Sequence, residues 1–181
     1  IITKRKKSVV NYRVTLGKSF KLREINYIIK DTAIERIVSE TYNETLITPG
    51  MRLSEKTLDL ESDRITNVLR ERGYYNFTKN FFFFEADTLA GDDLADLFIK
   101  IENYTRNETP KDARDHELYR IRKITLYPDY DPLRSRDDSL SKYNVLGMRN
   151  FTIYHRGERS IRPFVLEKMN ILKPGELYNE K

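Results

Sequence analysis

Apolar residues alternate with polar ones along two early stretches of the chain. The first stretch runs from Val10 to Leu16 and stops at Gly17, which is typical of a half-buried strand followed by a turn. The second runs from Phe20 to Ile29, but its phase slips between Leu22 and Ile25. A slip of this kind predicts a second strand that contains a β-bulge or a twist.

Two helices are predicted after these strands. Apolar residues from Ile34 to Tyr42 recur every three or four positions, and Thr32 and Glu35 have the spacing of a capping box. Ser54 is expected to cap the second helix, which ends at Gly73, a residue that readily takes the left-handed conformation of a helix end. The shared apolar face of this second helix consists of Leu58, Ile65, Val68 and Leu69.

Aromatic residues follow Gly73 directly, so we expect a strand from Tyr74 to about Glu85. Four consecutive phenylalanines, Phe81 to Phe84, place large side chains on both faces of that strand, because successive side chains alternate. A last strand is predicted from Leu94 to Tyr104, and the turn between them, from Asp87 to Asp93, indicates an antiparallel hairpin. The predicted order is strand, helix, helix, strand, strand.

Two segments recur later in the chain at different offsets. Leu46 to Gly50, a connector in which Pro49-Gly50 favours a type II turn, is echoed 125 residues later by Ile171 to Gly175, which contains Pro174. The first-strand pattern recurs 99 residues later, with Leu22, Ile25 and Tyr27 matched by Ile121, Ile124 and Leu126. The difference between the offsets predicts a repeat with an insertion, which we place at residues 128–150.

These patterns predict four parts. Residues 1–17 would be the terminal strand of a preceding repeat, 18–105 a complete repeat, 106–117 a polar linker, and 118–181 a partial repeat with an inserted loop at 128–150. Within the partial repeat we expect a strand at Phe151 to Tyr154 and a short helix at Pro163 to Asn170. The alternative is one compact α+β domain in which Val10 to Leu16 and Tyr119 to Tyr127 belong to the same sheet.

Composition narrows the class of protein further. The 181 residues include no cysteine, which excludes disulfides and thiolate chemistry, and 34% are charged. No apolar run approaches the roughly 20 residues of a membrane-spanning helix. The net charge of +5 includes one basic block, Lys4 to Lys7, which we interpret as a solvated end. Because the chain opens with Ile1, we expect it to be part of a longer protein.

Candidate catalytic groups are sparse. His116 in the linker and His155 in a strand have no partner histidine at ligand spacing, so both are predicted to lie at the surface. The acidic cluster of the hairpin turn lacks the regular alternation of a calcium loop. We therefore expect a non-catalytic protein without a cofactor or a metal. That cluster consists of Asp87, Asp92, Asp93 and Asp96.

The middle repeat resembles a POTRA domain of the BamA/TamA superfamily, the outer-membrane assembly factors of the bacterial surface antigen group. The resemblance is carried by Phe20 to Ile25, Pro49-Gly50, Leu69 to Phe77 (with Gly73-Tyr74 at its centre), and Phe84 to Thr88, and by Pro174-Gly175 in the next copy. It implies tandem β-α-α-β-β modules, each with a three-stranded mixed sheet and two helices on one face. It also implies a periplasmic location, tethered to the outer membrane of a Gram-negative bacterium by a C-terminal β-barrel of the same chain.

The resemblance further implies a sheet edge that accepts an extended chain by β-augmentation. Its partners would be unfolded outer-membrane protein precursors and periplasmic accessory proteins, and no nucleic acid is expected. The alternative is that one pair of phenylalanines packs against the adjacent repeat. The candidate edge residues are Tyr75, Phe77, Lys79, Phe81, Phe82, Phe83 and Phe84.

Two other functions fit the sequence. One is a POTRA module of a two-partner secretion transporter or of a division protein. The other is a basic α+β domain that binds nucleic acid, which the sequence pI near 9.2 and the aromatic content would support.

Overall fold

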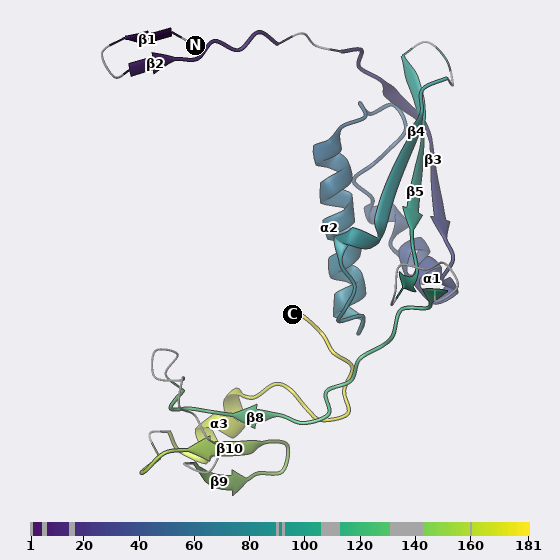
Figure 1. Cartoon of the computed structure of the whole chain (residues 1–181). Helices are drawn as coiled ribbons and strands as arrows, with labels where there is room; N and C mark the ends of the chain where they lie inside the picture. Colours follow the sequence, from purple (N-terminus) through teal and green to yellow (C-terminus); the bar gives the residue numbers. More distant parts are fainter. Residues whose placement is uncertain are drawn as a thin grey trace.

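The computed structural model describes residues 2–4, 7–14, 17–89, 91, 93–105, 113–130, 143–159 and 161–181. In these ranges the chain is an α+β protein (Figure 1). Its helices are α1 (Thr32–Glu40), α2 (Glu55–Glu71) and α3 (Pro163–Met169), with 3-10 turns η1 (Tyr42–Glu44) and η2 (Lys79–Phe81). Its strands are β1 (Ile2–Lys4), β2 (Lys7–Val9), β3 (Lys21–Ile29), β4 (Phe82–Asp87), β5 (Leu94–Ile101), β6 (Tyr104–Thr105), β7 (Ala113–Arg114), β8 (Thr125–Leu126), β9 (Asn144–Gly147) and β10 (Thr152–His155).

The first folded unit is built on a mixed three-stranded sheet. The strand order is β3-β5-β4, with β3 parallel and β4 antiparallel to the central β5. The register of β3 against β5 shifts between Leu22 and Ile25, which confirms the predicted irregularity at this point of the strand. The predicted order of strand, helix, helix, strand, strand is also confirmed.

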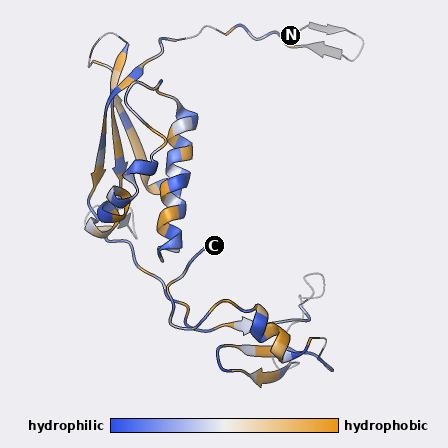
Figure 2. Cartoon of the chain, turned by 180° about the vertical axis from the view of Figure 1, so that it is seen from behind, coloured by the Kyte–Doolittle hydropathy of each residue, from blue (hydrophilic) through white to orange (hydrophobic). Residues whose placement is uncertain are grey.

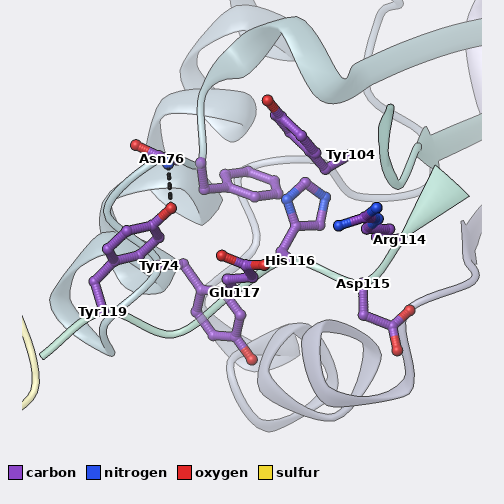
Figure 3. Close-up of a pocket in the computed structure, with 9 residues that line it drawn as sticks. Tyr74, Asn76, Tyr104, Arg114, Asp115, His116, Glu117 and Tyr119 are labelled. Carbon is purple, nitrogen blue, oxygen red and sulfur yellow. Dashed lines mark hydrogen bonds between the residues drawn. The ribbon is translucent and has the colours of Figure 1, made fainter. Parts of the chain in front are cut away.

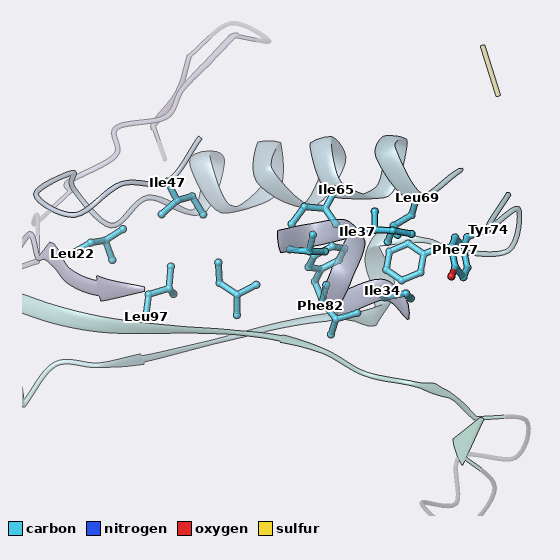
Figure 4. Packing of buried hydrophobic residues seen from close by; sticks show 13 residues of the cluster. Leu22, Ile34, Ile37, Ile47, Ile65, Leu69, Tyr74, Phe77, Phe82 and Leu97 are labelled. Atoms are coloured by element: carbon cyan, nitrogen blue, oxygen red, sulfur yellow. The ribbon is translucent and has the colours of Figure 1, made fainter. Parts of the chain in front are cut away.

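The core of this unit lies between the sheet and its two helices (Figure 4). Because facing residues of paired strands point the same way, one side of the sheet, which we call the helix face, carries the apolar side chains. The opposite side is called the open face. The buried core consists of Leu22, Ile34, Ile37, Val38, Ile47, Ile65, Leu69, Tyr74, Phe77, Phe82, Leu97, Ile99 and Ile101.

The helix ends are capped by specific residues. Asp31, rather than the predicted Thr32, caps α1, because its Oδ1 accepts hydrogen bonds from the amides of Ala33 (3.0 Å) and Ile34 (3.2 Å). An aspartate carboxylate one residue earlier reaches the same orphaned amides, so the capping-box prediction is wrong. Ser54 stands at the N-cap of α2 as predicted, although its side chain makes no capping hydrogen bond within the described chain.

The C-terminal end of α2 is a Schellman motif centred on Gly73, which confirms the predicted stop. The Gly73 amide donates to the Arg70 carbonyl (3.3 Å), and the Tyr74 amide donates to the Leu69 carbonyl (3.1 Å). Gly73 has φ +103°, in the left-handed region that favours glycine. The chain therefore turns sharply after α2 instead of extending into a strand.

Two predicted strands are corrected by the structure. Residues 10–14 form no strand, and Tyr12 is 86% exposed; an alternating segment needs a paired neighbour, and the described chain supplies none there. Thr15 and Leu16 lie outside the described residues, as do Arg5 and Lys6 of the basic block. The strand predicted from Tyr74 begins only at Phe82, because a turn and η2 occupy the residues between.

The second folded unit has a small sheet of order β8-β10-β9, with β8 parallel and β9 antiparallel to β10. The predicted strand near Phe151 and the helix that starts at Pro163 are both present. The insertion is more than a loop, because β9 lies in it and pairs with β10. Of the strand predicted from Tyr119 to Tyr127, only Thr125–Leu126 is regular strand. Residues 131–142 of the insertion and 106–112 of the linker lie outside the described residues.

Each unit has the same set of backbone hydrogen bonds around its proline-glycine turn. The residues that form them are related by the offsets of 99 and 125 positions found in the sequence. Around the first turn, the Leu22 amide donates to Met51 (2.8 Å), the Gly50 amide to Leu22 (2.7 Å), and the Leu53 amide to Phe20 (2.9 Å). The counterparts 99 or 125 residues later repeat all three bonds. They are Ile121 to Glu176 (2.9 Å), Gly175 to Ile121 (2.7 Å) and Tyr178 to Tyr119 (2.9 Å).

The two proline-glycine turns also match in conformation. Gly50 has φ +86° and Gly175 has φ +89°, as the third residue of a type II turn requires. Each turn is closed by a bond to the residue before its proline, from the Met51 amide to Thr48 (3.2 Å) and from Glu176 to Lys173 (3.3 Å). The units have separate sheets and separate cores, so the single-domain alternative is wrong.

A buried carboxylate ties α2 to β3 and to the loop after η1. Glu61 is 0% exposed, and its oxygens accept hydrogen bonds from Arg64 (2.7 and 3.0 Å) and the Leu46 amide (2.9 Å). The hydroxyls of Tyr27 (3.1 Å) and Thr45 (3.0 Å) donate to the same carboxylate. Burial alone would raise the pKa of Glu61, but these donors outweigh it and hold the pKa below its usual range.

Tyr27 provides a pH-dependent test of this network. Burial, reinforced by the charge of Glu61, raises the pKa of Tyr27 to about 12, against about 10 in an unfolded chain. The folded state therefore holds the proton more tightly, and this stabilisation is complete below pH 10 and is lost between pH 10 and 12. The titration of Tyr27 should lower the free energy of unfolding by about 2–3 kcal/mol across that window, and we expect Tyr27→Phe to abolish this loss. Denaturant unfolding of both proteins at several alkaline pH values measures this difference. An equal loss of stability in the two proteins between pH 10 and 12 would contradict the prediction.

Candidate peptide-binding edge

The four phenylalanines divide between the two faces of the sheet. Phe82 and Phe84 face Ile101 and Ile99 across the strand pair, so they lie on the helix face, where Phe82 is 8% exposed. Phe83 lies on the open face and is 53% exposed. Phe81 precedes β4, in η2. The surplus aromatic surface that the sequence predicted is therefore concentrated at Phe83.

The outer edge of β4 carries backbone groups without a strand partner among the described residues. The Glu102 amide donates to the Phe81 carbonyl (2.9 Å). In an antiparallel pair of strands, every second residue forms hydrogen bonds to the partner strand. Every second residue after Phe81 therefore also points its backbone groups at β5. The remaining residues point outward. They are Phe82, whose amide is already bonded to the Lys79 carbonyl, followed by Phe84 and Ala86.

A hollow of about 510 Å³ lies between this edge and α2. Phe84 and Leu58 supply its apolar surface. Lys79 stands at one side, where its ammonium pairs with Asp59 (2.8 Å) and Asp63 (3.1 Å) of α2. Hydrogen bonds to these two carboxylates raise the pKa of Lys79. An extended chain added to β4 would direct alternate side chains into this hollow.

A second hollow, of about 430 Å³, opens at the start of β4. Phe81 and Phe83 form its aromatic side, and Lys30, Asn80 and Glu102 supply polar groups. On the open face, Lys100 binds Glu85 and Arg23 binds Asp96. The Arg23 guanidinium holds the pKa of Asp96 below its usual range. Phe83 is thus an exposed aromatic residue among neutralised charges.

Three predicted edge residues lie outside the strand, because the chain turns at Gly73 and β4 begins only at Phe82. Phe77 is buried in the core, and Lys79 is fixed to α2 through its ion pairs. Tyr75 packs against Tyr119 (ring centroids 5.8 Å apart) and Tyr178 (4.9 Å) of the second unit. The adjacent repeat is therefore contacted by Tyr75, and not by a pair of phenylalanines.

Gly73 lies at the contact between the two units. Its carbonyl accepts a hydrogen bond from the Tyr119 amide (2.8 Å). A Cβ atom at Gly73 would lie 3.1 Å from a methyl carbon of Leu118 and 3.1 Å from one of Leu177. Ion pairs from Arg70 to Glu180 (2.5 Å) and from Glu71 to Lys181 (2.8 Å) flank this contact.

His116 is half-buried rather than fully exposed, and the sequence did not reveal the contacts that hold it. Its ring packs between Phe77 (4.9 Å between centroids) and Phe81 (4.6 Å), beside a hollow of about 170 Å³ (Figure 3). Its amide donates to Asp31 Oδ2 (2.9 Å), and Nε2 lies 3.0 Å from the Glu102 carbonyl oxygen. The end of the predicted linker is therefore bound to the first unit.

The proline-glycine and glycine-tyrosine motifs serve the fold, and their residues lie apart from the β4 edge. Pro49-Gly50 and Pro174-Gly175 form the matched turns, and Gly73-Tyr74 forms the end of α2. Across the described ranges, no three acidic or histidine side chains gather as a metal site. Asp92 of the predicted acidic cluster lies outside these ranges.

No family model matches the chain, and no curated protein matches it. The helices in the described part of the chain are all too short or too polar to cross a membrane.

Proposed function

We propose that the first unit is a non-catalytic, POTRA-type module that binds extended polypeptide along β4 by β-augmentation. The observation that carries the proposal is the outward-facing backbone of Phe84 and Ala86, next to the hollow between β4 and α2. An edge with free amides and carbonyls supplies affinity through main-chain hydrogen bonds, and flanking hollows supply side-chain preference. Phe83 adds apolar contact on the open face.

The proposal places the chain in an outer-membrane β-barrel protein assembly or translocation factor of the periplasm. Its partners there would be unfolded barrel precursors and accessory proteins. Support comes from the β-α-α-β-β order, the mixed sheet with two helices on one face, and the second unit that repeats the same turn. Residues 18–117 hold 20 acidic and 15 basic side chains, which disfavours nucleic acid as the ligand of this edge.

A proline at Ala86 tests the edge directly. Ala86 points its amide outward, so Ala86→Pro removes a donor needed by an added strand while leaving the bonds to β5 intact. We expect binding of a fluorescent nine-residue peptide that alternates Val or Phe with Ser or Thr to weaken roughly tenfold. Fluorescence anisotropy measures the affinity.

The matched control is Ala86→Thr, which keeps the amide and suits a strand. It should bind the peptide as the unsubstituted chain does. A peptide N-methylated at alternate residues should bind poorly to all three proteins, since it lacks the donors. Equal affinity of the proline and threonine variants would refute β-augmentation at this edge.

A further inference from the structure

The second unit exposes large apolar residues on α3 and on the segment that follows it. Figure 2 colours parts of this region as hydrophobic. One side of α3 packs on the small core through Leu166. The other large apolar residues of this region are exposed. They are Phe164, Val165, Met169, Ile171 and Leu172.

The repeated hydrogen bonds identify what covers the equivalent surface in the first unit. In the first unit, the amide of Ile47 bonds to the Thr45 side chain (3.3 Å); 125 residues later the Leu172 amide bonds to Asn170 Oδ1 (3.3 Å). Leu172 is therefore the counterpart of Ile47. Ile47 lies near the N-terminal end of α2 in the core of the first unit (Figure 4). It is 1% exposed, whereas Leu172 is 42% exposed.

We propose that this surface is a docking site for an amphipathic helix, seated on the second unit as α2 is seated on the first. The surface is separate from the β4 edge and does not depend on peptide binding there. Burying its large side chains removes apolar surface from water, which gives the docked helix its driving force.

The chemistry of the site specifies one feature of that helix. In the first unit, two of the groups that donate hydrogen bonds to Glu61 of α2 are the hydroxyls of Tyr27 and Thr45. The counterparts are Leu126, which has no hydroxyl, and Asn170, whose side chain is already bonded to the Leu172 backbone. A buried carboxylate would lose these donors, so the docked helix should carry an apolar residue at this position.

A graft tests the proposal. Residues 54–73 are copied after Tyr178, because Tyr178 is the counterpart of Leu53, and the copy carries Glu61→Leu. We expect the Met169 and Leu172 amides to gain at least roughly tenfold protection from hydrogen exchange, and binding of a hydrophobic dye to fall. The matched control adds Leu58→Ser, Ile65→Ser and Leu69→Ser to the copy and should show neither change.

A second graft that keeps Glu61 should protect the same amides less than the leucine version does. The native α2 serves as an internal standard, since its exchange should stay constant in all grafts. Equal exchange in the leucine and serine grafts would overturn the docking site. So would concentration-dependent dimerisation of the ungrafted chain that protects Met169, or its flotation with vesicles of anionic lipid, because either would assign the surface to another partner.

Discussion

Replacing Glu61 with glutamine is expected to destabilise the first unit by about 3–5 kcal/mol. All the groups around this carboxylate are donors, from Arg64, Tyr27, Thr45 and the Leu46 amide. A glutamine side chain turns one acceptor into a donor and leaves the Arg64 charge without its counter-ion. Hydrogen exchange of the α2 and β5 amides in the whole chain measures the loss.

Glu55→Gln is the matched control, because Glu55 is an exposed glutamate in the first turn of the same helix. It should change stability by less than about 1 kcal/mol. The folded-state pKa of Glu61 lies below that of an unfolded glutamate, so its stabilisation is present above the unfolded value of roughly 4.3 and is lost as the pH falls through the folded value. Glu61→Gln should flatten this acid dependence. An acid profile identical to that of the unsubstituted chain would argue against the buried network.

The neighbouring phenylalanines of β4 should respond oppositely to the same substitution. Phe82→Ala removes a buried ring from the core and should cost about 3–5 kcal/mol, whereas Phe83→Ala should change stability by no more than about 0.5 kcal/mol. Unfolding followed through the same exchange-protected β5 amides compares them. Peptide binding should weaken in Phe83→Ala, because its ring is exposed beside the edge.

The pair also tests the register of the hairpin. A one-residue slip of β4 would exchange the two faces and reverse the order of the two effects. Reversal would therefore place Phe83 in the core and contradict the assignment of the exposed ring.

Local periodic patterns accounted for much of the fold. The sequence predicts features that depend on a few adjacent residues. These are the irregularity between Leu22 and Ile25, the helix end at Gly73 and the helix start at Pro163. The sequence also predicts the repeat, because two turns of the same conformation need the same residue types at the same positions. Asp31 was a missed signal, because an aspartate before a helical pattern is a strong cap.

Long-range contacts set the limits of the sequence-based predictions. The aromatic run after Gly73 has strand composition, yet Phe77 enters the core and Tyr75 meets the second unit, and neither contact has a local signature. His116 is held by Asp31, 85 positions earlier in the chain. Of the predicted edge residues, Phe82 to Phe84 lie on the edge strand of the sheet. The residues before them have the composition of a strand but are not part of it.

The contact at Gly73 means that the C-terminal end of α2 helps to fix the orientation of the second unit. The orientation of everything after Leu118 depends on how closely that segment approaches a residue with no side chain. A methyl group there would shift the near end of the second unit only slightly, but the displacement would grow with distance along the chain. The absence of a side chain at Gly73 is thus one of the features that set how the second unit is oriented relative to β4.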